Sequence, residues 1–209
     1  MARRKRPRGD SQAAVFQAAA HEFAERGFEA ARVDRIAARA RVNKAMLYYH
    51  YRSKLALYTE VLRDMVRTIS ARGRAIADGA AAADVKLDDW VAAIVEEAAA
   101  RPWFPPIMLR ELASGASHID DETFAMINGV YLGFRDVMAQ GQRDGTFGDA
   151  DPVLTYFTIL PSILIFFARQ RVISQRRGMQ GLAAAAPRNT GEFIRHVQMT
   201  ARATLRRDR

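Results

Sequence analysis

The chain has 209 residues, 49% of them hydrophobic, and contains no cysteine. This length allows one large or two small domains whose core needs no disulfide or metal to hold it together. The absence of cysteine excludes a disulfide scaffold, thiolate metal sites and a cysteine nucleophile, and it fits a reducing compartment. We therefore expect a cytoplasmic protein.

The positive charge is concentrated at the amino-terminal end. Residues 1–54 hold 13 Lys and Arg against 5 Asp and Glu, a balance of +8, whereas the remaining 155 residues hold 19 against 18. A basic module followed by a nearly neutral one suggests a polyanion-binding part joined to a part with a different task.

Neither the amino terminus nor the most apolar segment suggests export or membrane insertion. The run VLTYFTILPSILIFFA, residues 153–168, is shorter than the roughly 20 residues of a membrane span and has Pro161 in its middle. We interpret it as a buried or interface helix. The basic stretch MARRKRPRGD is not followed by the apolar segment of a signal peptide, and we expect residues 1–9 to form a basic disordered arm.

Alanine-rich segments and the lack of a hairpin signal predict an all-α fold with about nine helices. The first helix is predicted to begin near Asp10 or Ser11, either of which can cap it. It is predicted to end at Gly27 in a left-handed C′ conformation, with Phe28 packing back on Phe23 as in a Schellman motif.

Two short helices and one long helix follow. Apolar residues at helical spacing predict a second helix over 33–40, and a tight turn is expected at residues 41 and 42. Asn43 can cap a third helix that runs to about residue 50, and Ser53 can cap a long fourth helix that extends to about residue 75. This pattern predicts a helix-turn-helix domain over residues 10–56, whose third helix enters the major groove of DNA.

Several ordered motifs strengthen this interpretation. They are F-A-x-x-G-[FY] at residues 23–28, V-x-x-I-A-x-x-A at residues 33–40 and L-Y-x-H at residues 47–50. With these motifs the segment FAERGFEAARVDRIAARARVNKAMLYYHYRSK resembles the DNA-binding region of the TetR family of transcriptional regulators. The resemblance implies a homodimer that binds a palindromic operator, usually as a repressor released by a small ligand.

The segment also departs from the family pattern. Gly is usual where Arg41 stands, Ser or Thr where Asn43 stands, and Gly-Thr where Ala45 and Met46 stand. If residue 41 keeps a positive φ, its arginine side chain costs about 1 to 2 kcal/mol. The usual Thr is also missing before residue 33, so the second helix has no obvious hydroxyl cap.

The first turn of the third helix is expected to meet base edges. Lys44 could donate to O6 and N7 of guanine, while Ala45 and Met46 could contact a thymine methyl group. Leu47 and Tyr51 are expected in the core. Phosphate contacts are expected from hydroxyl, imidazole and cationic side chains, namely Tyr48, Tyr49, His50, Lys54, Arg32, Arg35 and Arg41. The basic arm is either a simple tail or a further DNA contact.

Residues 57–209 are expected to form a ligand-binding and dimerisation domain. Its large side chains favour a bulky, mostly apolar small-molecule effector, and the candidates for the pocket are Trp90, Trp103, Phe104, Met108, Phe124, Tyr131 and Phe134. Arg110 and Glu111 either anchor a polar ligand group or pair with surface neighbours. The family resemblance assigns the homodimer interface to the helices near residues 152–172 and 191–206.

Other functions have less support from the residues. The four histidines form no metal-ligand spacing, and no nucleophile or phosphate-binding motif is present, so we expect no catalytic site, metal or cofactor. A helical enzyme would therefore lack a catalytic constellation. A peripheral membrane protein would need a basic amphipathic helix with apolar anchors, which the arm does not provide. A transcriptional activator of the same fold remains an alternative to a repressor.

Overall fold

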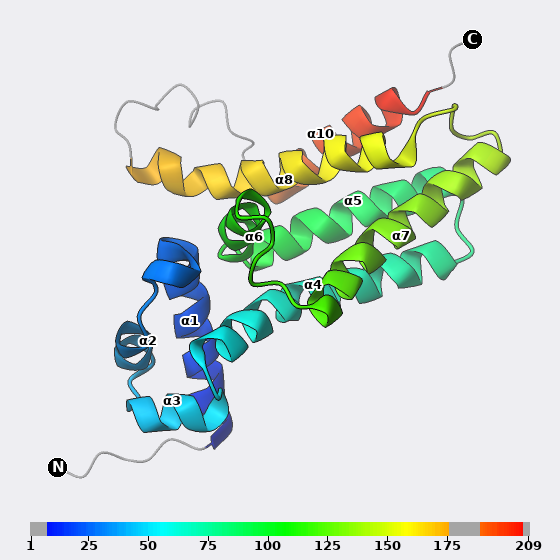
Figure 1. Ribbon diagram of the computed structural model, residues 1–209. Coiled ribbons are helices and arrows are strands. Elements are labelled where there is room, and N and C mark those ends of the chain that lie inside the picture. Colours follow the sequence, from blue (N-terminus) through cyan, green and yellow to red (C-terminus); the bar gives the residue numbers. More distant parts are fainter. Residues whose placement is uncertain (1–7, 176–188, 207–209) are drawn as a thin grey trace.

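The computed structural model describes residues 8–175 and 189–206. Within these two ranges it contains nine helices and no strand, which confirms the all-α prediction (Figure 1). The helices are α1 (Arg8–Ala30), α2 (Val33–Ala40), α3 (Lys44–His50), α4 (Lys54–Asp78), α5 (Ala83–Ala100), α6 (Phe104–Ala113), α7 (Asp121–Arg143), α8 (Pro152–Gln175) and α10 (Thr190–Thr204). Residues 1–7 of the predicted arm lie outside the described residues, and residues 8 and 9 already belong to α1.

The first helix breaks where the sequence predicts, but with a different backbone conformation. Gly27 has φ 73° and ψ 175°, which is not the left-handed helical conformation of a Schellman motif. One more helical turn follows it up to Ala30. The rings of Phe23 and Phe28 nevertheless stack with centroids 6.3 Å apart, so the expected contact across the break is present.

A Schellman ending occurs instead at the end of α2. Arg41 has φ 57° and ψ 38°, its N–H donates to the carbonyl of Ala38, and the N–H of Val42 donates to the carbonyl of Ala37. The positive φ considered for residue 41 is therefore present with an arginine in place, at a cost of about 1 to 2 kcal/mol. The predicted lack of a side-chain cap at the start of α2 is also observed.

The nine helices form two groups. The short helices α1, α2 and α3 pack together at one end of the molecule, and α4 leads from them into a layer with α5 and α7 (Figure 1). α6 is a short helix that contacts α1, α4 and α8. α8 and α10 lie together on the side of α5 that faces away from α4. This arrangement places α3 and α8 far apart.

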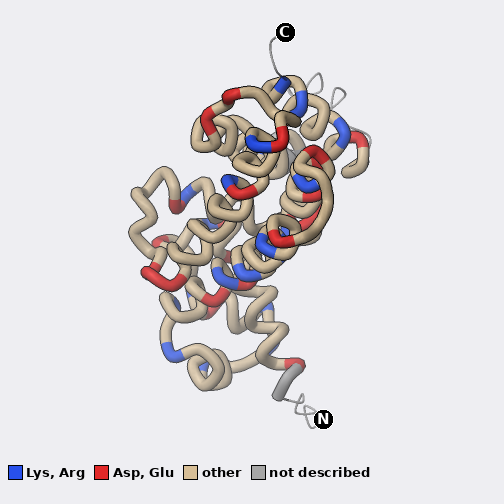
Figure 2. Tube along the Cα trace, turned by 90° about the vertical axis from the view of Figure 1, so that its right-hand side faces the viewer, with Lys and Arg blue, Asp and Glu red and all other residues tan. Residues whose placement is uncertain are grey.

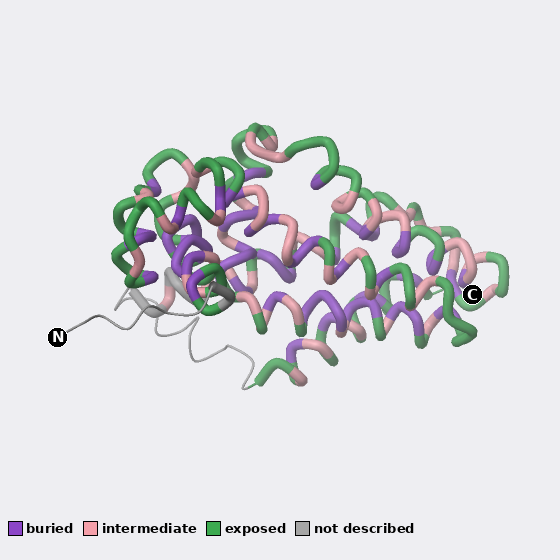
Figure 3. The backbone as a smooth tube through the Cα atoms, turned by 90° about the horizontal axis from the view of Figure 1, so that it is seen from below, coloured by how far each residue is buried: buried purple, intermediate pink, exposed green. Residues whose placement is uncertain are grey.

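Buried residues lie along the inner sides of the long helices, as the colouring of the backbone in Figure 3 shows. In the amino-terminal group the core is small, with Phe23, Ile36 and Leu47 fully buried. Tyr51 is also buried, as expected. The same core continues along α4 into the second group, so α4 connects the two groups through one continuous core.

The helix α8 has an unusual surface for its position. Its window Pro152–Arg169 is long and apolar enough to cross a membrane by length and composition, and only 33% of it is buried. Leu154, Phe157 and Ile165 on this helix are 70%, 62% and 56% exposed. We call the surface formed by these three residues the α8 face. Such a large apolar surface on a folded chain marks a place where another apolar surface binds.

Candidate nucleic-acid interface and effector pocket

Two features fix the position of α3, a side-chain hydrogen bond at its N-cap and one buried side chain. The side chain of Asn43 accepts a hydrogen bond from the N–H of Met46 at 2.7 Å, which confirms the predicted cap. Leu47 is fully buried and is the one buried residue of α3. With a single buried anchor, this two-turn helix leaves Lys44, Ala45, Tyr48 and Tyr49 exposed.

The outward surface of α3 carries several of the predicted DNA contacts. Lys44, Ala45, Tyr48 and Tyr49 are exposed, while Met46 and His50 are partly buried. Arg32, Arg35 and Arg41 are exposed on α2 and the turns at its ends. We call this outward surface of α3 the α3 face. Over the body of the molecule, by contrast, Lys and Arg are mixed with Asp and Glu, as Figure 2 shows.

Lys44 forms an ion pair with an acidic residue on this surface. Its Nζ lies 2.6 Å from Oδ1 of Asp34 on α2. The hydrogen bond and the charge of Asp34 both raise the pKa of Lys44, so the ammonium stays charged at neutral pH. A guanine contact by Lys44 therefore requires it to share or leave Asp34, a partner that the sequence analysis did not identify.

The ammonium group of Lys54 is hydrogen-bonded to the protein's own backbone. Its Nζ lies 2.8 Å, 3.4 Å and 3.3 Å from the backbone carbonyl oxygens of Phe28, Glu29 and Ala31. It also lies 4.3 Å from the ring centroid of Phe28. Because an ammonium group has only three N–H donors, this arrangement leaves none for a phosphate. The structure thus argues against the phosphate contact predicted for Lys54.

His50 also has an internal partner. Its Nε2 lies 2.8 Å from Oγ of Ser11 on α1, a hydrogen bond between residues 39 positions apart. Ser11 is buried and lies inside α1, so it does not cap the helix as the sequence suggested. A phosphate contact by His50 would have to use Nδ1, the other ring nitrogen.

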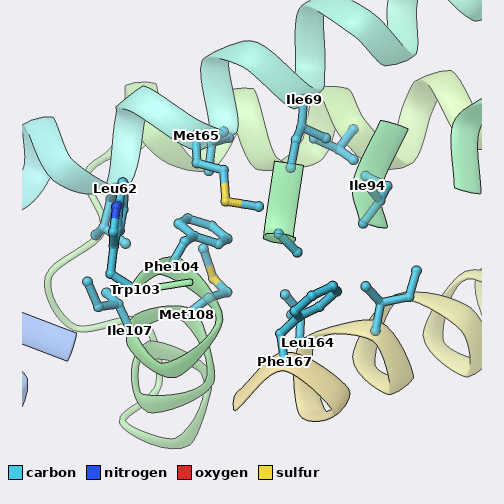
Figure 4. Close-up of a cluster of buried hydrophobic side chains, with 14 of the residues drawn as sticks. Leu62, Met65, Ile69, Ile94, Trp103, Phe104, Ile107, Met108, Leu164 and Phe167 are labelled. Atoms are coloured by element: carbon cyan, nitrogen blue, oxygen red, sulfur yellow. The ribbon is translucent and has the colours of Figure 1, made fainter. Parts of the chain in front are cut away.

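A small apolar cavity of about 60 Å³ lies in the second group of helices. In Figure 4 Met65, Phe104 and Met108 lie on one side of it, and Ile69, Ile94 and Leu164 on the other. The remaining lining residues come from α4, α7 and α8 and are Val66, Ile127, Val130, Tyr156 and Leu160. No lining residue carries a charge, so the cavity suits an apolar group.

Of the seven predicted pocket residues, only Phe104 and Met108 line this cavity. Phe124 is 60% exposed on α7 and does not line this cavity. Trp103 packs against Phe16 and lines a separate open groove of about 670 Å³ between α1, α4 and the end of α5.

The other three predicted pocket residues form a packed aromatic cluster around Tyr156. Trp90 and Phe134 are buried with ring centroids 4.8 Å apart, and Tyr131 meets Tyr156 edge to face at 5.3 Å. Burial raises the pKa of Tyr156, so its hydroxyl remains protonated at neutral pH. It is the only hydroxyl of the cavity lining and can donate one hydrogen bond.

Arg110 and Glu111 join helices rather than anchor a ligand. Glu111 is 2% exposed, and its carboxylate accepts hydrogen bonds from the hydroxyl of Tyr58 at 2.6 Å and the backbone N–H of His118 at 3.2 Å. Arg110 donates to the carbonyl of Ala24 in α1 at 2.7 Å. Glu111 is thus buried and pairs with neighbours inside the fold, and neither residue of the pair lines the apolar cavity.

The α8 face borders a groove of about 310 Å³ between α8 and α10. Four threonines line it, Thr155, Thr158, Thr200 and Thr204, and each hydroxyl donates to the backbone carbonyl four residues earlier in the chain. Since these hydroxyls are already bonded, the side chains present mainly methyl groups. The groove is more apolar than its composition suggests.

Within residues 8–175 and 189–206, no cluster of three His, Asp or Glu side chains could hold a metal ion. The fold and the α3 face define the class of protein, one that carries a helix-turn-helix DNA-binding domain. Residues 15–61 match the family model described as bacterial regulatory proteins, tetR family, so this segment is a DNA-binding region of the TetR type.

Two curated relatives share this amino-terminal region. The chain is 48% identical over 52 residues to the HTH-type transcriptional repressor SCO4008 of Streptomyces coelicolor, which is 25% of this chain and 27% of that protein. It is 46% identical over 57 residues to the HTH-type transcriptional activator FasR of Mycolicibacterium smegmatis, which is 27% of this chain and 26% of that protein. Each match thus spans about a quarter of the relative.

The whole fold resembles a solved regulator. The ketosteroid transcriptional regulator KstR2 of Mycobacterium tuberculosis superposes with a TM-score of 0.74 over 94% of this chain and 95% of that chain. The two sequences are 24% identical. The likeness therefore concerns the fold and extends through both groups of helices.

Proposed function

We propose that the chain is a homodimeric DNA-binding transcriptional repressor that a small, largely apolar ligand releases from a palindromic operator. The observation that carries this proposal is the presentation of α3. A capped two-turn helix buries only Leu47 and directs Lys44, Ala45 and two tyrosines outward, as a recognition helix must. Residues 10–56 form the DNA-binding domain in this proposal, and residues 57–209 form the effector and dimerisation domain.

The residues of the α3 face divide by the contacts that they can make. Lys44, Ala45 and Met46 in the first turn are suited to base edges. Tyr48 and Tyr49, together with the three arginines at positions 32, 35 and 41, are suited to phosphates. His50 is a weaker candidate because Ser11 occupies one of its nitrogens. We remove Lys54 from this set because its ammonium group donates hydrogen bonds to backbone carbonyls at the end of α1 and just beyond it.

Dimerisation through α8 and α10 is supported by the α8 face and the adjoining groove. Leu154, Phe157 and Ile165 are too exposed for a monomer in water, and the groove beside them presents methyl groups that can receive side chains from a second copy. A dimer also sets the geometry on DNA, because two recognition helices must lie about 34 to 36 Å apart to meet successive major grooves on one side.

The apolar cavity supports a small-molecule effector with an apolar body and no charge. At about 60 Å³ it is smaller than ligand sites, which occupy roughly 300 Å³ or more, so an effector must enlarge it. The hydroxyl of Tyr156 could donate to one neutral acceptor, such as a ketone. The name of the structural neighbour, a ketosteroid regulator, describes a ligand of this chemistry and makes steroid ketones the first compounds to test.

The experiment that tests the proposal combines selection and titration. Bound fragments are selected from genomic DNA, and binding of the enriched sequence is followed by fluorescence anisotropy at several salt concentrations. We expect an inverted repeat bound by one dimer, with affinity that falls steeply as salt rises. Binding to all sequences with equal affinity would contradict the proposal. Steroid ketones are then compared with their charged acid derivatives for release of the DNA.

An activator of the same fold is the second candidate. The relative FasR, named as an activator, is nearly as similar in the amino-terminal region as the repressor SCO4008. A reporter gene under the selected operator separates the two. Expression that rises when the protein is deleted indicates a repressor, and expression that falls indicates an activator.

A further inference from the structure

An acidic residue lies beside the surface that faces DNA in the proposed function. Asp34, in the first turn of α2, has a side chain that is 69% exposed and forms an ion pair with Lys44 of α3. The other charged residues of α2 and its ends are all cationic, namely Arg32, Arg35, Arg39 and Arg41. A carboxylate at this place repels phosphates and lowers the general affinity for DNA. This loss is offset if the carboxylate gains a partner on the DNA.

Two structural roles of Asp34 leave its position beside Lys44 unexplained. A negative charge in the first turn of a helix interacts favourably with the helix dipole, and α2 lacks a side-chain cap. That role needs no contact with α3. An ion pair between two exposed side chains adds little stability, because water and salt screen it. Neither role depends on the location of the pair at the first turn of the recognition helix.

The ion pair matches the major-groove edge of a G·C base pair in both chemistry and spacing. Guanine presents acceptors at N7 and O6, and cytosine presents a donor at its N4 amino group. O6 and N4 share a Watson–Crick hydrogen bond, so they lie about 2.9 Å apart. Nζ of Lys44 and Oδ1 of Asp34 lie 2.6 Å apart and present a donor and an acceptor in the complementary order. Both base contacts can therefore form while the ion pair stays intact.

The hydrogen-bonding capacity of the two side chains is sufficient for this arrangement. Lys44 has three N–H donors, so one can point at Asp34 while two remain for N7 and O6 of guanine. The carboxylate of Asp34 accepts from Lys44 and keeps lone pairs for the amino group of cytosine. The ion pair also restricts the long side chain of Lys44 before DNA binds, so less conformational freedom is lost on binding.

The same arrangement discriminates among the four base pairs. A C·G or an A·T pair places an amino group against the ammonium and a carbonyl oxygen against the carboxylate, so both contacts become repulsive. A T·A pair presents O4 and N6 in the matching order, but a methyl group replaces N7 and one N–H of Lys44 loses its acceptor. Only a G·C pair in one orientation satisfies both side chains.

We infer that Asp34 is a specificity-determining residue that contacts the cytosine of one G·C base pair in each half-site, while Lys44 contacts the guanine of the same base pair. This inference rests on the proposed function, in which Lys44 meets base edges, and it adds an acidic residue of α2 to the base contacts. Asp34 lowers the affinity for DNA in general and raises the selectivity for one base pair.

The first test changes the DNA and uses the unchanged protein. Each G·C pair of the selected operator is replaced in turn, in both half-sites, by a pair that contains 7-deazaguanine or N4-methylcytosine. The first analogue lacks the N7 acceptor, and the second carries a methyl group in place of the amino hydrogen that faces the major groove. We expect one G·C pair in each half-site at which either analogue weakens binding by about tenfold.

The second test removes the carboxylate. At that base pair N4-methylcytosine should change the affinity of Asp34→Ala by less than about twofold, whereas 7-deazaguanine should still weaken binding because Lys44 remains. The affinity of Asp34→Ala for unrelated DNA should rise by about twofold or more at low salt, since a repulsive charge is lost. Circular dichroism and thermal unfolding establish that the variant is folded.

Glu25→Ala is the matched control. Glu25 is also an exposed carboxylate of the DNA-binding domain, and it pairs with an arginine of α2, Arg39, at 3.4 Å. It lies on α1 rather than beside the first turn of α3. This variant should respond to both analogues as the unchanged protein does.

Two results would overturn the inference. One is an operator in which no G·C pair responds to N4-methylcytosine in the unchanged protein, a result that needs no variant to fold. The other is an equal response to N4-methylcytosine in the unchanged protein and in Asp34→Ala, which would reduce Asp34 to a structural role in α2. Failure of the proposed function has a different signature, because a protein that selects no operator disproves DNA recognition itself and the inference with it.

Discussion

The α3 face and the α8 face, at distant parts of the molecule, are both exposed, yet they differ in chemistry. The α3 face carries a lysine, two tyrosines and nearby arginines around one buried leucine. The α8 face carries Leu154, Phe157 and Ile165 beside a groove lined by methyl groups. The first surface is stable in water and attracts a polyanion, whereas the second is unfavourable in water until another apolar surface covers it.

The difference shows why exposure alone does not identify a partner. A cationic and aromatic surface on a short helix fits DNA, whose affinity depends on salt. An apolar surface of similar exposure fits a second copy of the chain, whose affinity depends on buried area and packing. The two surfaces also depend on each other, because only a dimer presents two recognition helices to one operator.

The largest effect is expected from a charge on the α8 face. Phe157→Glu should raise the dissociation constant of the dimer by about a hundredfold or more, because it removes an apolar anchor and leaves a carboxylate unpaired in the interface. Operator affinity should fall with it. Sedimentation velocity measures the oligomeric state, and Phe124→Glu is the control because Phe124 is equally exposed, at 60% against 62%, but lies on α7. A dimer that survives Phe157→Glu would contradict this assignment of the interface.

The next effect compares two lysines of the DNA-binding domain. Lys44→Met should lower the preference for operator over unrelated DNA by roughly tenfold, because a base contact is lost. Lys54→Met should leave that preference unchanged but lower the free energy of unfolding by about 1 kcal/mol, because three carbonyls lose a charged donor. Competition binding and urea unfolding measure the two quantities. Reversed outcomes would assign the DNA contact to Lys54.

A smaller effect is expected from the buried hydrogen bond between Tyr58 of α4 and Glu111 of α6. Tyr58→Phe should reduce the free energy of unfolding by about 1 to 2 kcal/mol, because the buried carboxylate of Glu111 loses a donor. Burial and the hydrogen bond to Glu111 raise the pKa of Tyr58 above its ordinary value of 10.0. Above that pH the unfolded chain releases the phenolic proton and the folded chain keeps it, so stability falls as pH rises.

Urea unfolding between pH 8 and pH 11 tests this pH dependence. Above about pH 10 the free energy of unfolding should fall less steeply in Tyr58→Phe than in the unchanged protein. The two slopes should differ by up to about 1.4 kcal/mol for each pH unit. Equal slopes in both proteins would show that Tyr58 does not contribute to the alkaline loss. Tyr51 and Tyr156, whose pKa values burial also raises, contribute to the slope that remains.

The smallest effect is expected in the groove beside α8. Thr158→Val should change the dimer dissociation constant by less than about threefold, because the hydroxyl of Thr158 donates to Leu154 of its own helix and only the methyl group faces the groove. The measurement is again sedimentation velocity. A change of more than tenfold would mean that the hydroxyl itself crosses the interface, and the apolar description of the groove would then be wrong.

Much of the fold could be predicted because its signals are local. The caps Asn43 and Ser53, the lack of a cap before α2 and the apolar spacing of residues 33–40 all act within a few residues of the helix that they define. The Schellman motif was expected at Gly27 and occurs at Arg41 instead. Glycine alone does not specify which left-handed conformation the backbone adopts, and at Gly27 the crossing side chain of Arg110 is part of its environment.

The candidate sites were predicted less completely. The sequence indicated the recognition helix, but it could not show that Lys44, His50 and Lys54, among the ten proposed DNA contacts, have partners elsewhere in the protein. The sequence predicts an effector pocket among large aromatic residues, whereas the apolar cavity has Met65, Ile69, Ile94 and Leu164 in much of its lining. Aliphatic residues at helical spacing look the same in sequence whether they fill a core or surround a cavity, so no local signal distinguishes them.

The sequence by itself determined the helices, the recognition motif and the concentration of positive charge in the first 54 residues, since propensity, capping and charge act over short distances along the chain. The tertiary structure alone decided which charged and polar groups remain available for a partner. Ser11 meets His50 across 39 residues, Phe28 meets Lys54 across 26, and Ala24 meets Arg110 across 86. These contacts form because folding brings distant segments together, and a buried carbonyl or carboxylate must then find its hydrogen-bond donor wherever the fold supplies one.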